Sequence, residues 1–511
     1  MNIDRRSFLL GSAAAATLAG RAQGKAPLRQ LKPGEKRTAA IIGCGGMNRG
    51  LMGQLLNNNI APNVRVVAVC DCDRSRAAMF AKIVNKRYGD DKCRVSYDFR
   101  ELVADPGIDL FCIATPDHWH AYIAVEAMKH GKDVYCEKPL TYSIEEAKQV
   151  MAAQTKYGRV LQTGSWQRSD RVFRDAVALV RGGLIGNVRY VDANYGAIGK
   201  FGGPSHPVRF WNDPANAAKE GAPNPDIDWL MWLGPARLRP YSSELSFRGP
   251  SGTPMFWRCD DDLASGMNGD WGAHHLDIVQ WALDMDEGGP YRVIRSDEPH
   301  STNLYHGGRR QWGMSMLFKK PYGDVKLYHG PFSVFWADNP SGRKEWDSRG
   351  HGWGAVFYGD TGIVAVNRGK IAVWTGTGLV EPNLEIRRQV ERCTFMPDKI
   401  AFSSITPGAP KLGKVLDGIE AKYAAEIKRA NLYFSGHHMR NFLECVESRR
   451  LPITHAGVGG HSSILCQLCN LSYKYDTGFD WDPVKMEFAN GTGRGIPLGR
   501  PGDCNGWKVV V

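Results

Sequence analysis

The chain has 511 residues, a formal net charge of +12, and 43% hydrophobic and 23% charged residues. This length favours two domains, and the composition is that of a globular protein and excludes a disordered chain. The basic residues are spread along the sequence rather than gathered into a run, so we expect no nucleic-acid partner.

The first residues predict an export signal. Arg5 and Arg6 precede a short apolar stretch rich in small residues, which is too short to span a bilayer. This context is typical of a twin-arginine signal. We therefore expect residues 1–30 to be a signal peptide and linker, cleaved within 20–27, and a periplasmic or exported protein without stable membrane insertion. An uncleaved N-terminal anchor is the alternative.

A dinucleotide-binding unit is predicted next. Residues 38–42 have the pattern of a buried strand, and GCGGMNRG and a helical pattern follow. In such a unit Gly43 permits the tight turn, Gly45 lets the backbone approach a pyrophosphate, and the helix N-terminus offers N–H groups to the anion. Asn48 replaces the third glycine of the fingerprint, so we expect looser packing of helix on strand there.

The second predicted strand, 64–71, ends in Asp71, which lies 28 residues after Gly43. A carboxylate at this position can accept hydrogen bonds from both ribose hydroxyls and repels a 2′-phosphate, which favours NAD over NADP. The alternative is that Asp71 only caps the following helix. Arg74 and Arg76 keep NADP open.

Two further strand ends carry polar residues. The apolar run that begins at Ile108 leads into the polar loop of ATPDHWHA and then a helix, and the strand in 133–140 ends in Glu137, Lys138 and Pro139. Strands that alternate with helices predict a parallel, doubly wound sheet. Ligands bind beyond the carboxyl ends of such strands, and Asp71, 115–120 and 137–139 all lie there.

These segments resemble the glucose-fructose oxidoreductase, inositol dehydrogenase and rhizopine catabolism family, Gfo/Idh/MocA. The matching segments are GCGGMNRG, the strand-end Asp71, ATPDHWHA, CEKPL and GMNGDWGAHHLDIVQWAL. The resemblance implies an α/β fold, with an NAD-binding Rossmann domain at 36–162 and a C-terminal α/β domain with an open, mainly antiparallel sheet at 163–511. It also implies a homo-oligomer that transfers a hydride between a bound nicotinamide and a hydroxyl of a sugar, glycoside or cyclic polyol.

Carried over by position, the resemblance assigns three sets of residues. The catalytic set is Lys138, Asp270 and His274. The cofactor-binding set is Gly43, Gly45, Gly46, Met47, Asp71, Thr115, Pro116, His118, His120, Glu137, Lys138 and Gln167. The substrate-binding set is Lys138, Trp166, Arg168, Asp270 and His274, to which Trp257 is added as a candidate sugar contact because it lies in an irregular stretch rich in Trp.

The catalytic residue types suit hydride transfer from a carbinol carbon. The hydroxyl proton must also leave, and an imidazole such as His274 is the usual base. Asp270 lies four residues earlier, where it could orient the imidazole or bind a second hydroxyl. Lys138 could donate to the reacting oxygen. His275 and Asp277 are expected to be structural, and no metal is expected because no fourth ligand is evident.

The rest of the chain gives weaker signals. The irregular stretch 195–262 is expected to carry function or to contact a second subunit. Strand-like runs from 313 onward predict a sheet, and 437–450 predicts a helix. Cys466 and Cys469 lie in an apolar segment that reads as a buried helix rather than a metal or redox site.

Three classes of function remain open. The first is an NAD-dependent carbohydrate oxidoreductase, and the second is an NAD-dependent glycosidase that oxidises C3 transiently and eliminates the aglycone. The third is a non-catalytic sugar-binding protein. Outside the cytoplasm there is no nicotinamide pool, so an exported enzyme must hold its NAD tightly and regenerate it in place.

Overall fold

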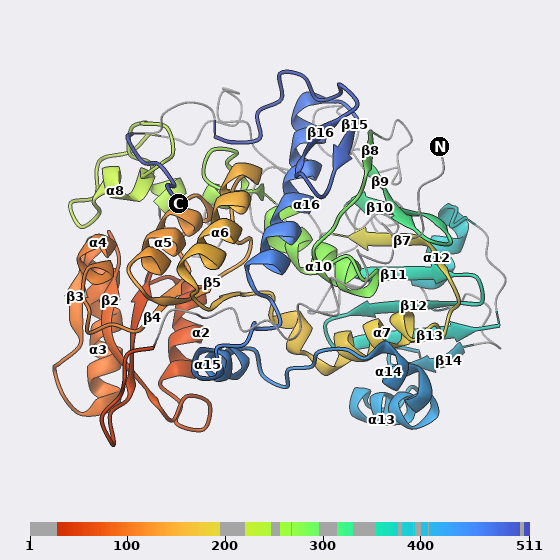
Figure 1. Ribbon diagram of the computed structural model, residues 1–511, viewed down its shortest axis with the longest axis horizontal. Coiled ribbons are helices and arrows are strands. Elements are labelled where there is room, and N and C mark those ends of the chain that lie inside the picture. The colour runs from red at the N-terminus through yellow and green to blue at the C-terminus, as the bar shows by residue number, and fades with distance from the viewer. Residues whose placement is uncertain are drawn as a thin grey trace.

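The computed structural model describes residues 28–194, 220–246, 256–266, 268–295, 314–330, 353–376, 381–391, 393, 400–406, 408–500 and 505–511. The predicted twin-arginine segment and half of the irregular stretch 195–262 lie outside the described residues. Figure 1 shows two sheets side by side, the first toward the red end of the colour scale and the second in yellow, green and blue.

The first sheet has six parallel strands in the order β3-β2-β1-β4-β5-β6. This is the doubly wound Rossmann order, which confirms the predicted fold of the first domain. The strands are β1 Arg37–Ile42, β2 Val64–Cys70, β3 Arg94–Ser96, β4 Leu110–Ile113, β5 Asp133–Cys136 and β6 Leu161–Thr163. Strands β4, β5 and β6 are buried throughout, as a sheet covered on both faces requires.

Helices connect these strands. They are α2 Gly46–Leu55, α3 Arg74–Tyr88, α4 Phe99–Val103, α5 Asp117–Lys129 and α6 Ile144–Tyr157. The predicted C-terminal helix is α15 His438–Ser448, and its apolar residues Met439, Phe442 and Val446 pack into the core of this domain. A segment remote in sequence therefore completes the first domain.

The second sheet has ten strands in the order β14-β13-β12-β11-β7-β10-β9-β8-β15-β16. All neighbours are antiparallel except the parallel pair β7 and β10, which confirms the predicted mainly antiparallel sheet. The strands are β7 Val188–Asn194, β8 Arg292–Arg295, β9 Met314–Lys320, β10 Gly323–Gly330, β11 Ala355–Gly359, β12 Gly362–Asn367, β13 Lys370–Thr375, β14 Ile400–Ser403, β15 Phe479–Asp482 and β16 Glu487–Ala489.

Helices α7 Arg171–Arg181, α10 Ala273–Ala282 and α16 Ala456–Tyr475 share a hydrophobic core with this sheet. Helix α16 also packs against α6, and Figure 1 shows α10 and α16 between the two sheets. Helix α16 carries Cys466 and Cys469, which are both buried and form no disulfide, and this confirms the predicted buried helix. None of the described helices is long and apolar enough to cross a membrane.

Shorter elements complete the described chain. The α-helices are α8 Trp229–Leu233, α9 Ser243–Ser246, α12 Leu384–Glu391, α13 Leu412–Lys422 and α14 Ala424–Ala430. There are also two short 3₁₀ helices, η1 Trp166–Ser169 and η3 Phe256–Cys259, and a π-helical turn, η4 Asn268–Gly272. Elements η1, η3 and η4 lie at the junction of the two domains and supply side chains to the site described below.

Candidate active site

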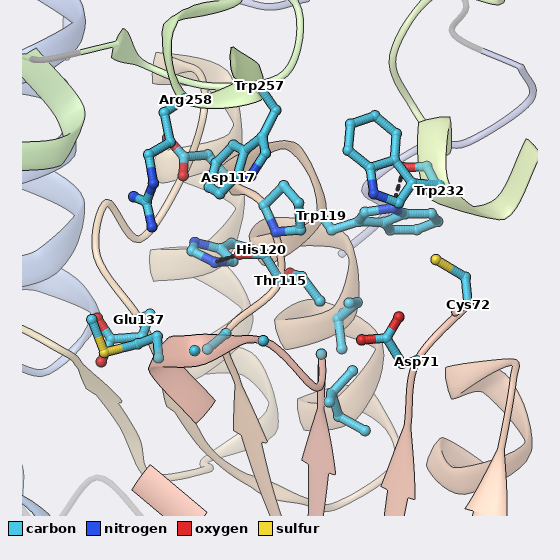
Figure 2. Close-up of a pocket in the computed structure, with 18 of the residues that line it drawn as sticks. Asp71, Cys72, Thr115, Asp117, Trp119, His120, Glu137, Trp232, Trp257 and Arg258 are labelled. Atoms are coloured by element: carbon cyan, nitrogen blue, oxygen red, sulfur yellow. Dashed lines mark hydrogen bonds between the residues drawn. The ribbon is translucent and has the colours of Figure 1, made fainter. Parts of the chain in front are cut away.

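A cavity of about 470 Å³ runs along the carboxyl ends of β1, β2, β4 and β5. Loops after these strands form one wall, and residues from the second domain form the other. Figure 2 shows Asp71, Thr115 and Glu137 at the strand ends, with Trp232, Trp257 and Arg258 above them. Both the position and the size are those of ligand sites in open α/β sheets.

The glycine-rich loop is shaped for close approach of a ligand. Gly43 has a φ of 87°, and a Cβ there would lie 2.8 Å from the carbonyl oxygen of Ala114, so only glycine fits. A Cβ on Gly45 would meet nothing within 4 Å, so the loop is open on that side. Helix α2 starts without a side-chain cap, whereas side chains cap α3, α4 and α6. Its first N–H groups are therefore available to an anion.

Asn48, the residue in place of the third fingerprint glycine, does not loosen the packing. Its side chain is fully buried, and Nδ2 donates to the carbonyl oxygens of Ile42 and Gly43, each at 2.7 Å. The expectation of looser packing was wrong, because these hydrogen bonds tie the helix to the loop where a glycine would allow only close contact.

Asp71 lines the cavity and holds the glycine-rich loop. Its Oδ2 accepts the backbone N–H of Cys44 at 2.6 Å, and its Oδ1 accepts that of Asp73 at 2.9 Å. Burial raises the pKa of Asp71. The cap of α3 is Asp73, which accepts from the N–H of Arg76. The alternative role of Asp71 as a helix cap is therefore wrong, and its role toward a ribose stays a prediction.

Residues 220–246, which we call the cover segment, close the Asp71 end of the cavity. Asp73 and Ile227 form an antiparallel bridge, and the N–H of Asp228 donates to the carbonyl oxygen of Cys72 at 3.0 Å. Ile227 itself lines the cavity. The second domain is thus joined to the loop after β2 by backbone hydrogen bonds.

Trp119 on α5 anchors the same segment. Its indole N–H donates to the carbonyl oxygen of Met231 at 3.1 Å, and Gly234 packs so closely that a Cβ there would lie 2.1 Å from the indole ring. Trp119 and Trp232 both line the cavity, and Figure 2 shows them together above Cys72. This end of the cavity is therefore walled by aromatic rings.

Arg76, one of the two arginines that left NADP as an alternative cofactor, makes hydrogen bonds to two groups of the protein. Its Nε donates to Asp73 Oδ2 at 3.0 Å, and its Nη2 donates to the carbonyl oxygen of Ser246 at 3.2 Å. The Arg74 guanidinium lies over the ring of Tyr97, with its carbon 4.4 Å from the ring centroid. Both arginines therefore have contacts within the protein.

The opposite end of the cavity holds the predicted catalytic set. Lys138 Nζ donates to the carbonyl oxygen of Asp270 at 2.8 Å and to its Oδ1 at 2.6 Å, and Arg258 Nη1 donates to the same Oδ1 at 3.2 Å. Burial opposes ionisation of Asp270, but the charges of Lys138 and Arg258 outweigh it and lower its pKa to about 2. The structure thus pairs Asp270 with Lys138.

His274 lines the same end of the cavity. It lies in the first turn of α10, which directly follows the π-helical turn η4 that carries Asp270. Its ring contacts those of Trp166 and Trp271, with centroids 5.9 and 6.3 Å apart. Burial and then the charge of Lys138 hold the pKa of His274 well below its usual range. The imidazole is therefore neutral at neutral pH and able to accept a proton.

Between the two ends lie His120, Thr115 and Glu137. His120 has one ring nitrogen 2.7 Å from the carbonyl oxygen of Pro139 and the other 3.0 Å from that of Thr115. Burial raises the pKa of Glu137 to about 7. Within the described structure, Glu137 Oε1 and Thr115 Oγ1 are buried without a hydrogen-bond partner.

Four more predicted residues, Gly46, Met47, Pro116 and Trp257, also line the cavity, whereas His118, Gln167 and Arg168 do not. His118 is fully buried, with its ring nitrogens each 3.0 Å from the carbonyl oxygens of Leu263 and Trp232. It therefore joins α5 to the second domain instead of facing a cofactor. Gln167 is buried within η1.

Arg168 departs furthest from its predicted role in substrate binding. Its Nε donates to Asp277 Oδ2 at 2.8 Å, its Nη2 donates to Asp286 Oδ1 at 2.8 Å, and the side chain is 1% exposed. The buried carboxylate draws the guanidinium away from the cavity, so Arg168 ties η1 to α10. His275 is also structural and bonds to the carbonyl oxygen of Asn194.

Four further residues that line the cavity were not predicted from the sequence: Trp119, Trp232, Trp271 and Arg368. Arg368, in the turn between β12 and β13, lies between two indole rings, 4.6 Å from the centroid of Trp166 and 4.5 Å from that of Trp271. Trp119 and Trp271 stand inside the family-like segments and could have been found there. No cluster in the described ranges groups three His, Cys, Asp or Glu residues that could hold a metal ion.

A glycine-rich loop and a strand-end carboxylate at one end, and a Lys-Asp-His set at the other, thus line one cavity at the edge of a Rossmann sheet. Residues 37–165 match the Gfo/Idh/MocA oxidoreductase family domain with the NAD-binding Rossmann fold, and residues 197–309 match that family's C-terminal alpha/beta domain. The first domain is therefore an NAD-binding Rossmann domain.

Curated relatives are similar to about three tenths of the chain. Residue identity is 32% over 152 residues with scyllo-inositol 2-dehydrogenase (NAD(+)) of Bacillus subtilis, covering 29% of this chain and 43% of that protein. It is 33% over 153 residues with inositol 2-dehydrogenase of Rubrobacter xylanophilus, covering 30% and 42%. The chain thus matches about two fifths of the length of these relatives.

Solved structures share the whole fold at low identity. The WlbA dehydrogenase of Bordetella pertussis, in complex with NADH and UDP-GlcNAcA, has a TM-score of 0.53 at 14% identity, over 88% of this chain and 99% of that one. Levoglucosan dehydrogenase, in complex with NADH and levoglucosan, has a TM-score of 0.51 at 17% identity, over 87% and 99%.

Proposed function

We propose that the protein transfers a hydride between a tightly held NAD and a hydroxyl-bearing carbon of a sugar, glycoside or cyclic polyol. One observation carries this proposal: the Lys138–Asp270 pair and His274 face the same cavity as the glycine-rich loop and Asp71. A dinucleotide that spans these two ends would present its reactive ring to the Lys-Asp-His set.

The residues present fit NAD. The uncapped start of α2 and the open face of Gly45 suit a pyrophosphate, and Asp71 suits a ribose. Thr115 and Glu137 line the cavity between these two ends. When bound, NAD supplies the hydride acceptor, and the chain must supply positioning and proton transfer.

Within the catalytic set, each side chain has a separate task. Lys138 has an ammonium group fixed by Asp270, from which it can donate a hydrogen bond to the reacting oxygen and stabilise developing negative charge. Neutral His274 accepts the hydroxyl proton. Asp270, ionised between two cations, holds the Lys138 side chain in place.

The names of the relatives support a polyol or sugar substrate, since two of them are inositol dehydrogenases. The twin-arginine sequence supports a periplasmic or exported location, reached after folding with NAD in place. The cover segment supports tight retention of NAD, since it closes the Asp71 end through backbone hydrogen bonds. A homo-oligomer is proposed on the family resemblance alone.

The test mixes the purified mature protein, without added cofactor, with a panel of glycosides, free sugars and cyclic polyols. Absorbance reports reduced nicotinamide, and mass spectrometry reports products. We expect one equivalent of NADH to form and then stall until a ketone acceptor is added. Steady release of aglycone without net NADH would instead establish the glycosidase. Bound NAD with neither signal would favour a sugar-binding protein.

A further inference from the structure

Residues 505–511, which we call the clasp segment, lie behind the wall at the Asp71 end of the cavity without lining the cavity themselves. Figure 1 shows this end of the chain near α5 and α8. Val509 and Val511 pack against the apolar core that α5 shares with the first sheet. The clasp segment is therefore docked on the first domain, although it follows β16 of the second domain in the sequence.

Trp507 contacts two aromatic rings of the cavity wall. Its ring centroid lies 4.7 Å from that of Trp119, at an interplanar angle of 80°, and 6.1 Å from that of Phe99. Trp119 and Phe99 also meet edge to face, with centroids 5.5 Å apart, and both line the cavity. Such pairs favour a particular relative orientation of the rings. Trp507 therefore supports, from behind, two rings that form the wall of the cofactor site.

Asn505 binds the cover segment directly. Its Nδ2 donates to the carbonyl oxygens of Gly234 and Ala236, each at 2.7 Å. The backbone of Asn505 has a positive φ of 55°, a conformation in which asparagine is enriched. Gly234 is thus held on two sides, by the indole ring of Trp119 and by the amide of Asn505.

Arg500, which precedes the clasp segment, makes a second connection between the domains. Its Nε donates to Glu146 on α6 at 2.9 Å, and its Nη1 donates to the carbonyl oxygen of Asp262 at 3.0 Å. Asp262 in turn accepts the backbone N–H of Arg237, in the cover segment, at 2.7 Å. This part of the chain thus reaches the cover segment twice, through Asp262 and through Asn505.

We propose that the clasp segment controls the release of NAD, with Trp507 and Asn505 as positioning residues that keep Trp119 and the cover segment against the cofactor site. The cover segment meets the loop after β2 through two backbone hydrogen bonds, each of which contributes little by itself. The clasp segment holds it from the other side and must move when the wall opens. This inference rests on the proposed retention of NAD, for which it names the residues responsible.

Loss of the clasp segment should change how the protein uses its cofactor. In the parent protein, the substrate should reduce one equivalent of NAD, and the NADH should stay bound until an acceptor is added. In a variant that lacks 505–511, NADH should leave and added NAD should replace it. Reduced nicotinamide would then accumulate beyond one equivalent, as in a dehydrogenase that exchanges its cofactor.

Exchange of bound NAD for isotopically labelled NAD, without any substrate, tests the inference. Trp507→Ala and Asn505→Asp should each speed NAD release about 3- to 10-fold, because one removes the aromatic contacts and the other removes the donor of two hydrogen bonds. Deletion of 505–511 should speed release about 10-fold or more, because it removes both kinds of contact at once. Trp507→Phe, which keeps a ring in place, should restore slow release.

Phe488→Ala is the matched control. Like Trp507, Phe488 is half-buried and contacts two aromatic rings, those of Phe479 and Trp481, with centroids 4.9 and 5.6 Å apart. It lies on β16 and does not line the cavity. Its loss should lower the stability of the second domain without changing the rate of NAD release.

Hydrogen exchange separates this role from a general loss of stability. In Trp507→Ala and Asn505→Asp, the N–H of Asp228, which donates to Cys72, should exchange faster, whereas the N–H groups of α10 should be unchanged. If Trp507→Ala does not fold, Asn505→Asp still decides, because it keeps the shape of the side chain. Release at the parent rate from the folded variants, or an equal increase in Phe488→Ala, would overturn the inference.

The two proposals fail separately. NAD release is measured without substrate, so faster release from the clasp variants alone would keep the inference even if no compound transferred a hydride to NAD. Reduction of bound NAD by a sugar, together with unchanged release from the variants, would keep the oxidoreductase and refute the role of the clasp segment.

Discussion

The two ends of the cavity are built by different means. At the Asp71 end, backbone hydrogen bonds join the cover segment to the loop after β2, and the rings of Trp119 and Trp232 form the wall. At the Lys138 end, the domains meet through charged side chains, the closest of which are Lys138 and Asp270. One end is arranged for retention of a ligand and the other for exchange and chemistry.

This difference suits the tight retention of NAD that we propose. Cofactor exchange would require the cover segment to separate from the strand-end loops, and the two backbone hydrogen bonds from Arg74 to Asp226 and from Asp228 to Cys72 would break together. The substrate end needs no such opening, because its side chains can rearrange individually. The comparison therefore predicts that changes at the two ends separate turnover from cofactor retention.

The largest effect is expected from Lys138→Ala at the reaction end. The change removes the donor to the reacting oxygen, so turnover should fall about 10²–10⁴-fold, the usual range for a lost proton-transfer or charge-stabilising group. NAD should remain bound, because the Asp71 end is unchanged. Turnover rates and extraction of bound cofactor check both points, with Lys148→Ala, at a surface pair with Glu145, as control. Full activity would remove Lys138 from the mechanism.

A second prediction concerns a residue that belongs to neither end. Arg168→Met should lower the free energy of unfolding by about 3 kcal/mol, because it leaves Asp277 buried without its main partner. The substrate KM of the folded enzyme should not change. Arg171→Met, at a half-exposed pair with Glu420, should cost less than about 1 kcal/mol. Denaturant unfolding measures the stability of each variant, and kinetics measure its KM. A raised KM with unchanged stability would mean that Arg168 binds the substrate.

The sequence was sufficient for most of the fold. Alternation of apolar strands and helices predicted the first sheet, because buried parallel strands have distinctive apolar runs bounded by turns. Short strand-like runs also predicted the second sheet. What could not be predicted was the return of α15 into the first domain, since its apolar face carries no information about which core it joins.

The site was predicted where local motifs exist. Gly43, Asp71, Lys138 and His274 follow from strand ends and family-like segments, and all line the cavity. Arg368 has no such signal, because only the folded sheet brings its turn beside Trp166. Arg168 shows the converse. Its proximity to Trp166 in the sequence suggested a cavity residue, but its side chain binds the buried carboxylate of Asp277, which lies 109 positions away.

The smallest effect, and the most direct test of the comparison, is expected from Gly234→Ala in the cover segment. A Cβ there would overlap the ring of Trp119, so the segment must shift away from α5. Overpacking of this kind costs about 1–3 kcal/mol, and we expect NAD to dissociate about 10-fold faster. Turnover by the fraction that keeps NAD should be unchanged, because Lys138, Asp270 and His274 lie at the other end.

The matched control is Gly89→Ala, since Gly89 also has a positive φ, of 70° against 47° for Gly234, but a Cβ there meets nothing within 4 Å. Both changes strain the backbone, and only Gly234→Ala displaces the cover segment. Exchange of bound NAD for isotopically labelled NAD, followed by mass spectrometry, measures the release rate. Equal release from both variants and the parent protein would mean that the cover segment does not hold the cofactor, and the contrast between the two ends would then be one of packing alone.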